Sequence, residues 1–406
     1  MVGYGKKIMT TKKYKIVVAS SAYPPSIMGG GEISTQKLCE LLASYGHQVV
    51  SVSFSDVEQS EIINGVKVVR LIPNWGYSLF YAKGKSLYDK VQWRIREEYS
   101  NLLAKQVLDI AIQENADFLV TSTIEDVSTY LWPLAKTQGI KTIHILRSFY
   151  LLCWSGTMYK NEKNCDGQCL LCKASNVNKI KNSQFVDTVV GISRSVLDIH
   201  LASGAFVTSM HKVIPNVCFD NEEPIVKRDY SGSEFSPIIM GYIGRIHPTK
   251  GIEDIIQGIY TSGRCNDIKL VVAGKGDEAY LEQLKAMAKN MKVEFDYMGH
   301  MTQEAFFNSV DVITVPSKWR EPFGRVVVEA FSFGVPVIAR GVGGMPEIVT
   351  PTSGYLYSDI DELVEIYKSL NLSKLSKLNF EGIDKYMPKA IYNEWKLLLE
   401  GLMLPV

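Results

Sequence analysis

Two glutamates stand eight positions apart in the segment EPFGRVVVE, which runs from Glu321 to Glu329. Pro322 and Gly324 interrupt the chain just before an apolar periodicity begins, and this pattern predicts a helix after a tight loop. Glu321 then lies in the loop, and Glu329 lies about a turn and a half into the helix, where both can face one cleft. The free N–H groups of a helix N-terminus bind anions. Beside them, one carboxylate suits sugar hydroxyls and the other suits a ribose.

A second segment, GRIHPTKG from Gly244 to Gly251, follows a predicted strand and precedes a predicted helix. Its Arg245 and Lys250 place two cations in a loop with glycine at both ends. Arginine offers a planar fork to phosphate and lysine a point charge. Fixed positive charge of this kind stabilises a diphosphate leaving group, whose negative charge grows as a bond to it breaks. A pair of solvated loop cations is the alternative.

The run GGG at residues 29–31 follows the first predicted strand, and Glu32 opens the next helix. Glycine allows a backbone to approach a phosphate or a sugar closely. A flexible loop is the alternative interpretation. A further glycine turn in VVAGKGDE, residues 271–278, is interpreted as mainly structural.

Four of the seven cysteines fall in one short loop, with the spacing C-x11-C-x3-C-x2-C. Four thiolates in a reducing compartment favour a tetrahedral zinc ion with a structural role. A cysteine-rich loop of reduced thiols, or a disulfide formed outside the cell, stays open as an alternative. The four predicted ligands are Cys153, Cys165, Cys169 and Cys172.

The pair Asp359 and Asp361 forms a D-x-D sequence, which in another fold would bind a metal–diphosphate complex. Here it precedes the amphipathic stretch ELVEIYKSL. We therefore interpret Asp359 as a helix N-cap followed by a first-turn acid, and we reject the metal interpretation.

The helices and strands around these motifs must position them. Short apolar runs alternate with longer helical stretches along the chain. That alternation predicts an α/β protein with parallel sheets. Each motif follows a predicted strand, as ligand sites do at the carboxyl ends of parallel strands. The clearest predicted helix runs from Glu32 to Tyr45 and ends at Gly46, and another covers about residues 85–114. The predicted strands begin near Lys15, Gln48, Val66, Phe118, Thr142 and Thr188, and then near Ile238, Lys269, Val293, Asp311 and Pro336.

The 406 residues divide into five predicted regions. Residues 1–13 form a disordered basic tail, and 14–220 form the first Rossmann-like domain. A polar linker follows at 221–236, and the second Rossmann-like domain covers 237–385. Residues 386–406 hold a last helix that packs back across the junction.

Composition excludes several classes of protein. The formal net charge is +1, so no overall field draws the chain to nucleic acid. No apolar run approaches the length of a membrane span, and the N-terminal lysines precede no signal-peptide core. We expect a cytoplasmic protein with reduced thiols.

The segment PSKWREPFGRVVVEAFSFGVPVIARGVGGMPEIV resembles the E-x7-E motif of the retaining, nucleotide-sugar-dependent glycosyltransferases of the GT-B fold, known as group 1 or family 4. Besides the two glutamates, the residues Pro316-Ser317, Gly334-Val335-Pro336, Gly343-Gly344 and Glu347 fall where that family has them. The resemblance covers nearly the whole chain from Lys15 and is strongest between Gly241 and Glu347. A chance spacing of two glutamates is the alternative.

The resemblance implies two Rossmann-like domains facing across a cleft, with the nucleotide-sugar on the second domain and the acceptor on the first. It implies transfer of a sugar to an acceptor hydroxyl with retention, without a catalytic metal. Glu321 would hold the donor sugar, Glu329 the ribose, and Arg245 with Lys250 the diphosphate. The full implied donor site comprises Gly30, Gly31, Gly244, Arg245, Lys250, Gly299, His300, Met301, Glu321, Phe323, Gly324, Arg325 and Glu329.

The chain departs from the family pattern where many relatives carry His-Asp after the strand TIHIL. It has Arg147-Ser148 there, and His144 lies three residues earlier. Either Arg147 takes the sugar-facing place as a catalytic residue, or the loop is shifted. Ser193 and Arg194 match a family position at the cleft mouth, with a plain helix N-cap as the alternative.

Partners and pathway follow from the resemblance only in outline. We expect a UDP- or GDP-sugar donor and a carbohydrate or lipid-linked acceptor, in bacterial polysaccharide or glycoconjugate synthesis. An aromatic and basic stretch, Trp75 to Lys85, is an acceptor lip, a membrane-surface contact at the inner face or a packed loop. The alternatives to a transferase are a non-catalytic sugar-nucleotide-binding scaffold and a hydrolase or epimerase on the same fold.

Overall fold

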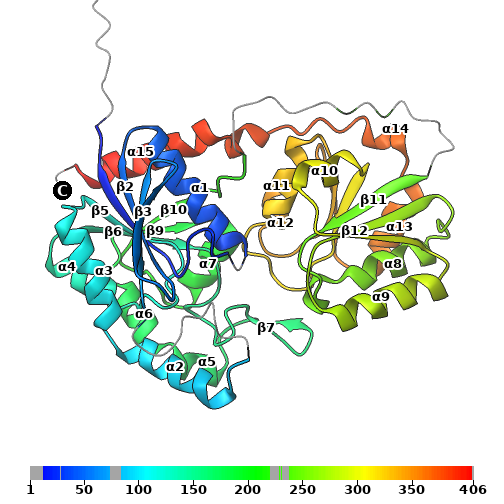
Figure 1. Ribbon diagram of the computed structural model, residues 1–406. Helices are drawn as coiled ribbons and strands as arrows, with labels where there is room; N and C mark the ends of the chain where they lie inside the picture. Colours follow the sequence, from blue (N-terminus) through cyan, green and yellow to red (C-terminus); the bar gives the residue numbers. More distant parts are fainter. Residues whose placement is uncertain are drawn as a thin grey trace, which may run out of the picture.

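The computed structural model describes residues 12–27, 29–73, 84–219, 228, 230 and 237–404. Two lobes lie side by side, each built on a central sheet with helices on both faces (Figure 1). The predicted tail therefore lies almost wholly outside the described residues, as does most of the predicted linker. Within that linker, Arg228 donates to the carbonyls of Phe307 and Val310, and Tyr230 donates to the carbonyl of Asp311 at 2.9 Å.

The first sheet has eight strands in the order β10-β9-β6-β5-β1-β2-β4-β3. All neighbours pair in parallel except β3 with β4. The central strand β1 is almost fully buried, as expected of a parallel strand covered on both faces. The strands are β1 (Lys15–Ala19), β2 (Gln48–Phe54), β3 (Gln59–Ile63), β4 (Val66–Leu71), β5 (Phe118–Thr121), β6 (Lys141–Leu146), β9 (Thr188–Gly191) and β10 (Met210–Val213). The helices are α1 (Gly30–Ser44), α2 (Leu87–Tyr99), α3 (Leu102–Gln113), α4 (Leu131–Thr137), α5 (Leu170–Ser175), α6 (Val177–Ser183) and α7 (Arg194–Ala202).

The second sheet has six parallel strands in the order β13-β12-β11-β14-β15-β16. They are β11 (Ile238–Ile243), β12 (Ile268–Ala273), β13 (Glu294–Gly299), β14 (Val312–Val315), β15 (Val337–Arg340) and β16 (Gly354–Tyr357). Around them lie the helices η2 (Pro248–Lys250), α8 (Ile252–Thr261), α9 (Glu278–Asn290), α10 (Gln303–Asn308), α11 (Arg325–Ser332), α12 (Met345–Ile348), α13 (Ile360–Ser369), α14 (Leu372–Leu375) and η3 (Ile383–Tyr386).

Both sheets reverse their strand order at one point, between β1 and β5 in the first and between β11 and β14 in the second. Such a switch point opens a crevice at the carboxyl ends of the strands, because the following loops diverge to opposite faces. The loops after β1, β11 and β14 carry the glycine run, the Arg245–Lys250 pair and Glu321. The topology therefore brings the three sequence motifs toward one crevice.

All eleven predicted strands are present, and α1 ends as predicted, with Gly46 in the left-handed region at φ 88°. Asp359 caps α13 by accepting from the amide of Glu362, which confirms the N-cap interpretation. The single helix predicted for residues 85–114 is wrong. It is divided into α2 and α3, because Ser100 is extended and its hydroxyl accepts from the amide of Leu102.

The last helix, α15 (Pro388–Leu402), follows the second lobe in sequence but lies along the first (Figure 1). Its Tyr392 stacks on Tyr45 at the end of α1, with ring centroids 3.5 Å apart and planes 11° apart. Helix α15 therefore packs as part of the first lobe.

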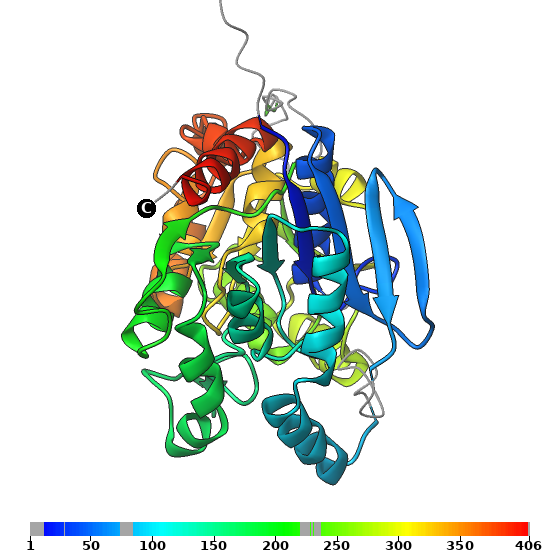
Figure 2. The same cartoon turned by 90° about the vertical axis from the view of Figure 1, so that its left-hand side faces the viewer.

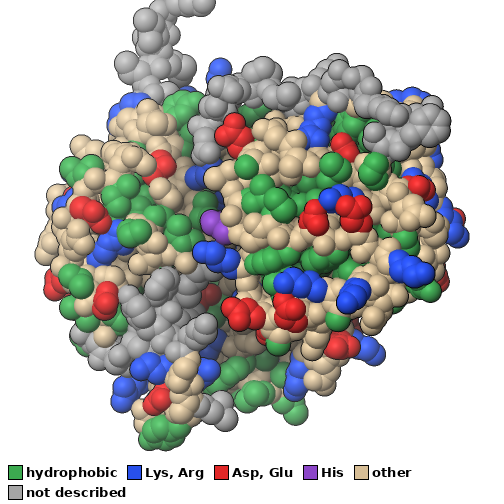
Figure 3. All heavy atoms as spheres, turned by 45° about the vertical axis from the view of Figure 1, so that its right-hand side comes forward, with side chains coloured by type: hydrophobic (Ala, Val, Ile, Leu, Met, Phe, Trp, Pro, Cys, Tyr) green, Lys and Arg blue, Asp and Glu red, His purple; other side chains and the backbone are tan. Residues whose placement is uncertain are grey.

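No helix among the described residues has both the length and the apolar character needed to cross a membrane. The outer side of the first lobe shows strands β3 and β4 at one edge and α2 and α5 at its lower end (Figure 2). The face in Figure 3 mixes acidic and basic side chains, without a large area of one sign.

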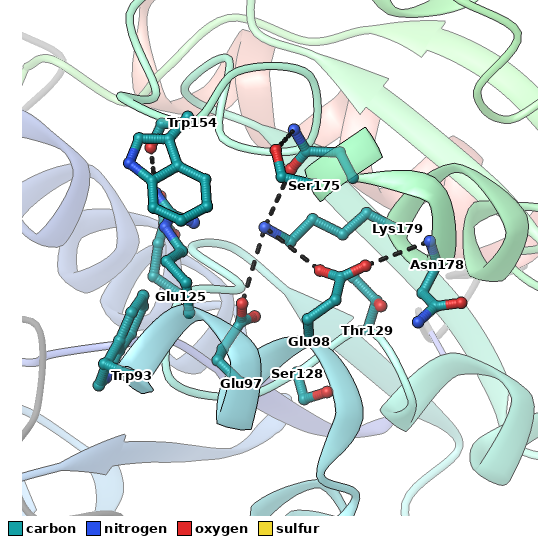
Figure 4. Close-up of polar contacts among 12 residues, drawn as sticks. Trp93, Glu97, Glu98, Glu125, Ser128, Thr129, Trp154, Ser175, Asn178 and Lys179 are labelled. Atoms are coloured by element: carbon teal, nitrogen blue, oxygen red, sulfur yellow. Dashed lines mark hydrogen bonds and ion pairs between the residues drawn. The ribbon is translucent and has the colours of Figure 1, made fainter. Parts of the chain in front are cut away.

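A buried cluster of charges joins α2 to α6 (Figure 4). The ammonium of Lys179, which is 1% exposed, lies 3.6 Å from an oxygen of Glu97 and 3.6 Å from an oxygen of Glu98. It also donates to the side-chain oxygen of Asn176 at 3.1 Å, and Glu98 accepts from the amide of Asn178. The cluster joins the two helices, because one ammonium of α6 lies between two glutamates of α2.

Burial raises the pKa of Glu98 from 4.5 to about 7, against the attraction of Lys179. The folded protein then binds this proton more tightly than the unfolded chain, so its contribution to stability is present below pH 4.5 and lost as the pH rises to about 7. Glu98→Gln should remove this loss, so that wild type loses on the order of 2 kcal/mol relative to the variant across that range. Urea unfolding at several pH values measures it. Glu394→Gln, on the exposed face of α15, is the control; parallel curves for wild type and Glu98→Gln would contradict the prediction.

Candidate active site

A cavity of about 410 Å³ lies between the two lobes at the switch points of both sheets. The first lobe contributes the glycine run at the start of α1, and the second contributes the loops after β11 and β14. Seven of the predicted donor-site residues line it: Gly30, Gly244, Arg245, Lys250, Glu321, Gly324 and Arg325. Its other walls include Tyr242, Trp319 and Met345, which the sequence analysis did not single out.

The carboxylate of Glu321 is held by three donors on one oxygen. Lys250 forms an ion pair with it, Ser317 donates at 2.8 Å and Trp319 donates through its indole N–H at 3.0 Å. The ammonium of Lys250 also lies 5.3 Å from the centre of the Trp319 ring. The predicted sugar-binding carboxylate and one predicted phosphate-binding cation are thus in direct contact, and the other carboxylate oxygen accepts no hydrogen bond from the described residues.

Arg245 is the exposed cation of the cavity. Its guanidinium has no hydrogen-bonding partner among the described residues, while its carbonyl accepts from Tyr242 at 2.9 Å. The loop that carries it packs closely on the next one, since a Cβ on Gly274 would lie 1.8 Å from the carbonyl oxygen of Gly244. Glycine is therefore required there, and the guanidinium projects from a fixed backbone.

Helix α11 begins at the cavity wall. Gly324 has φ 124° and precedes its first residue, and Gly324, Arg325 and Val326 line the cavity, so the free amides of the first turn lie at its wall. The backbone of Glu321 is held by the loop after β15, where a Cβ on Gly343 would lie 2.1 Å from the carbonyl oxygen of Glu321. The next residue, Gly344, donates to the same carbonyl at 2.8 Å. Phe323 is buried below this turn, 4% exposed, so only its backbone can reach a ligand.

Arg325 crosses between the lobes. It donates twice to one oxygen of Glu329, at 2.8 and 3.1 Å, and its third nitrogen donates to the hydroxyl of Ser34 in α1 at 2.8 Å. It also lies against Gly30, where an added Cβ would be 3.2 Å from its Cδ. Glu329 is 7% exposed and does not line the cavity. Its carboxylate is paired with Arg325 instead.

Arg147 lies at the end of β6, outside the cavity lining. It donates to Ser122 at 2.6 Å and to Asn216. Burial lowers its pKa to about 10, and repulsion from Arg325 adds to the shift. The alternative histidine, His144, points into the core of the first lobe, where it is 3% exposed and burial lowers its pKa to about 3. Of the two, Arg147 is therefore the residue near the interface.

Besides Phe323 and Glu329, four predicted donor residues lie outside the cavity lining: Gly31, Gly299, His300 and Met301. Gly299 is nevertheless beside the site, because its carbonyl accepts from the amide of Gly274 at 2.7 Å. His300 is exposed next to it, at the outer rim of the second sheet. Gly31 is turned toward the first lobe, against the side chain of Thr123.

The lobes are joined beside the cavity by two further contacts. The hydroxyl of Ser193 caps α7, as one interpretation had it, and also donates to the carbonyl of Pro322 at 2.6 Å. The carboxylate of Glu347 accepts from the amides of Arg194 and Ser195 at 2.7 and 2.8 Å, so a residue of the second lobe occupies the N-terminus of α7. Sequence patterns give no sign of such a cap, because its partners are more than 150 positions apart.

The four predicted zinc ligands are free cysteines gathered around the loop after β6. Cys153 and Cys172 are buried, and the amide of Trp154 donates to the sulfur of Cys172 at 3.4 Å. In the described ranges, no three His, Cys, Asp or Glu side chains are arranged to hold a metal ion. Zinc binding therefore stays a prediction from the spacing.

Elemental analysis of the purified protein checks it. A zinc knuckle gives about one zinc per chain, since four thiolates complete a tetrahedral site. A folded protein without zinc, in which all four thiols react with a thiol reagent after denaturation, would rule the metal out.

The fold is that of the GT-B glycosyltransferases. HepE from Anabaena, solved in complex with UDP and glucose, superposes with a TM-score of 0.65 at 16% identity, over 95% of this chain and 99% of that one. This likeness confirms the predicted fold class of two Rossmann-like domains.

Sequence comparisons give the class of activity. Residues 227–375 match the family model described as "Glycosyl transferases group 1". A Klebsiella pneumoniae protein, described as an uncharacterized 42.6 kDa protein in the cps region, is 29% identical over 86% of this chain and 92% of its own length. An uncharacterized glycosyltransferase of Methanocaldococcus jannaschii is 26% identical over 82% of each. Together these likenesses support glycosyltransferase function of the group 1 type.

Proposed function

We propose that the protein transfers a glycosyl group from a nucleoside-diphosphate-sugar to an acceptor hydroxyl with retention of configuration. The observation that carries the proposal is the cavity at the two switch points, where Arg245, Lys250, Glu321 and the start of α11 meet. Cations and free amides suit a diphosphate, and a carboxylate beside them suits sugar hydroxyls.

In this proposal each group has a separate task. Arg245 and Lys250 stabilise the charge that grows on the departing diphosphate, which then accepts the proton of the acceptor hydroxyl. When the diphosphate binds, the ammonium of Lys250 moves from Glu321 to the phosphate. The carboxylate of Glu321 then accepts hydrogen bonds from the sugar hydroxyls. The amides of Phe323 and Gly324 hold the phosphate or the sugar. Glu329 binds the ribose by sharing its carboxylate between the hydroxyls and Arg325.

The donor nucleotide is proposed to be UDP, because HepE was solved with UDP and with glucose. A role in bacterial polysaccharide or glycoconjugate synthesis is proposed from the cps region that the Klebsiella relative's description names. The acceptor approaches from the first lobe. Most of the aromatic and basic stretch from Trp75 to Lys85 lies outside the described residues, so its place as an acceptor lip or a membrane contact stays a prediction.

A thermal-shift screen of nucleotides and nucleotide-sugars tests donor binding, since a ligand at 100 times its dissociation constant stabilises by about 2.7 kcal/mol. Turnover with a carbohydrate acceptor then separates the classes. Nucleotide binding without any turnover would favour a scaffold, and release of free sugar without an acceptor would favour a hydrolase.

Metal removal is a further prediction. The cavity supplies its own cations for the diphosphate, so activity should survive EDTA over the time of an assay. Activity that disappears with EDTA and returns with Mg²⁺ would contradict this.

A further inference from the structure

Residues 147–176 form an insertion of the first lobe that reaches the second. It leaves β6, turns through the cysteine-rich loop and projects a small hairpin, β7 (Tyr159–Lys160) and β8 (Lys163–Asn164). The hairpin extends from the first lobe to beneath the second (Figure 1). The spacing of the cysteines does not explain why the hairpin extends to the second lobe.

The second strand of the hairpin makes a two-point contact with the backbone of the loop that precedes Glu321. The side-chain amide of Asn164 donates to the carbonyl of Lys318 at 2.9 Å and accepts from the amide of Arg320 at 2.7 Å. Arg320 returns a bond from its guanidinium to the carbonyl of Cys165 at 3.3 Å. Asparagine suits this place, because it both donates and accepts from one planar group.

Between the two bonded positions stands Trp319, whose indole N–H donates to Glu321 at 3.0 Å. On its other side the segment is held by the amide of Lys318, which donates to the carbonyl of Thr249 at 2.9 Å, next to Lys250. Asn164 therefore fixes the backbone on both sides of the residue that orients the Glu321 carboxylate.

The start and the end of the insertion are anchored to the first lobe, so Asn164 is held in place relative to that lobe. Arg94 of α2 lies 4.4 Å from the ring centre of Tyr150 and donates to the carbonyl of Trp154. Lys179, just after the insertion, lies 3.9 Å from the same Tyr150 ring and is held by the buried glutamates of α2 (Figure 4). Both ends of the insertion are thus fixed to one helix of the first lobe.

We propose that residues 147–176 act as a strut between the lobes, and that Asn164 is a positioning residue for the transfer step. Through Trp319 it holds the carboxylate of Glu321 in the geometry that transfer requires. This proposal rests on the proposed function of Glu321. A displacement of about 1 Å from the reacting geometry costs on the order of 100-fold in rate, so a residue that never touches the substrate can set the turnover number.

Asn164→Ala tests the strut, with Lys163→Ala as the matched control, because Lys163 is an exposed neighbour in the same hairpin. Asn164→Ala should lower kcat about 10-fold or more. It should leave the affinity for free UDP within about twofold, since the residues that line the cavity are unchanged. Asn164→Asp keeps the acceptor for Arg320 and loses the donor to Lys318, so its kcat should lie between the two.

Hydrogen exchange of the peptide 317–322 supplies a readout that does not depend on turnover. The amide of Arg320 should exchange faster in Asn164→Ala than in wild type or Lys163→Ala, because its acceptor is gone. Unchanged exchange would overturn the strut, even if no acceptor for transfer has been found. Faster exchange with unchanged kcat would overturn the positioning role of Asn164, and absence of turnover in wild type would count against the proposed function alone.

Discussion

Lys250→Ala and Arg245→Ala should each lower turnover by about 10²–10³, by analogy with the removal of one donor to a developing oxyanion. Both side chains line the cavity from the loop after β11, and neither supports the core. The variants should therefore unfold at close to the wild-type temperature while kcat falls. Steady-state kinetics with a nucleotide-sugar, beside a thermal melt, measure both quantities.

The two variants should differ in one respect. Lys250→Ala also removes the partner of Glu321 and leaves that carboxylate with the donors Ser317 and Trp319, whereas Arg245→Ala breaks no bond among the described residues. Lys250→Ala should thus also loosen the hold on the Glu321 carboxylate, and Arg245→Ala should not. Lys275→Ala, in the neighbouring loop and outside the cavity lining, is the control. Wild-type kinetics in either cavity variant would refute the assignment of the diphosphate site.

Glu321→Gln and Glu329→Ala should separate kinetically. Glu321→Gln keeps the shape of the side chain and removes its charge, so it should depress kcat by about 10²-fold or more while leaving the affinity for UDP nearly intact. Glu329→Ala should weaken the binding of free UDP, because it removes the proposed ribose contact. Calorimetric titration with UDP and initial rates with the nucleotide-sugar distinguish the two losses.

The structure adds a control for the second variant. Glu329 holds Arg325, which in turn holds Ser34 of the first lobe, so part of the effect of Glu329→Ala could come through the interface. Ser34→Ala removes only that interface bond. If it reproduces the loss of UDP affinity, Glu329 acts through Arg325 and not on the ribose. If Glu321→Gln and Glu329→Ala behave alike, the separate roles of the two glutamates are wrong.

The sequence predicts the sheet strands well where the chain is buried on both faces. Runs such as IVVA in β1 and LVVA in β12 are almost fully buried, and continuous apolar runs are typical of parallel strands. The strands that were missed are at edges or short, as with β3, β10 and β16. The break between α2 and α3 could have been predicted, because Ser100 and Asn101 are unfavourable inside helices and favoured at their ends.

The residues of the candidate site also fall into those that the sequence predicts and those that it does not. Glu321, Lys250, Arg245 and Gly30 could be found because each stands in a local motif at the end of a strand. The pair of Arg325 with Glu329 has helical i, i+4 spacing and could have been predicted. Contacts between segments more than 100 positions apart have no local signature, and these include the cap of α7 by Glu347 and the bonds of Asn164.

The stacking of Tyr392 on Tyr45 gives the first lobe a late step in its assembly. Helices and strands up to β10 can form as soon as they are synthesised, but the surface of α1 that receives α15 stays uncovered until Pro388–Leu402 have left the ribosome. In between, the whole second lobe is translated and can fold by itself on local strand pairs. Closing a loop of this length is slow compared with forming neighbouring contacts. The docking of α15 on α1 should therefore follow the pairing of the strands within each lobe.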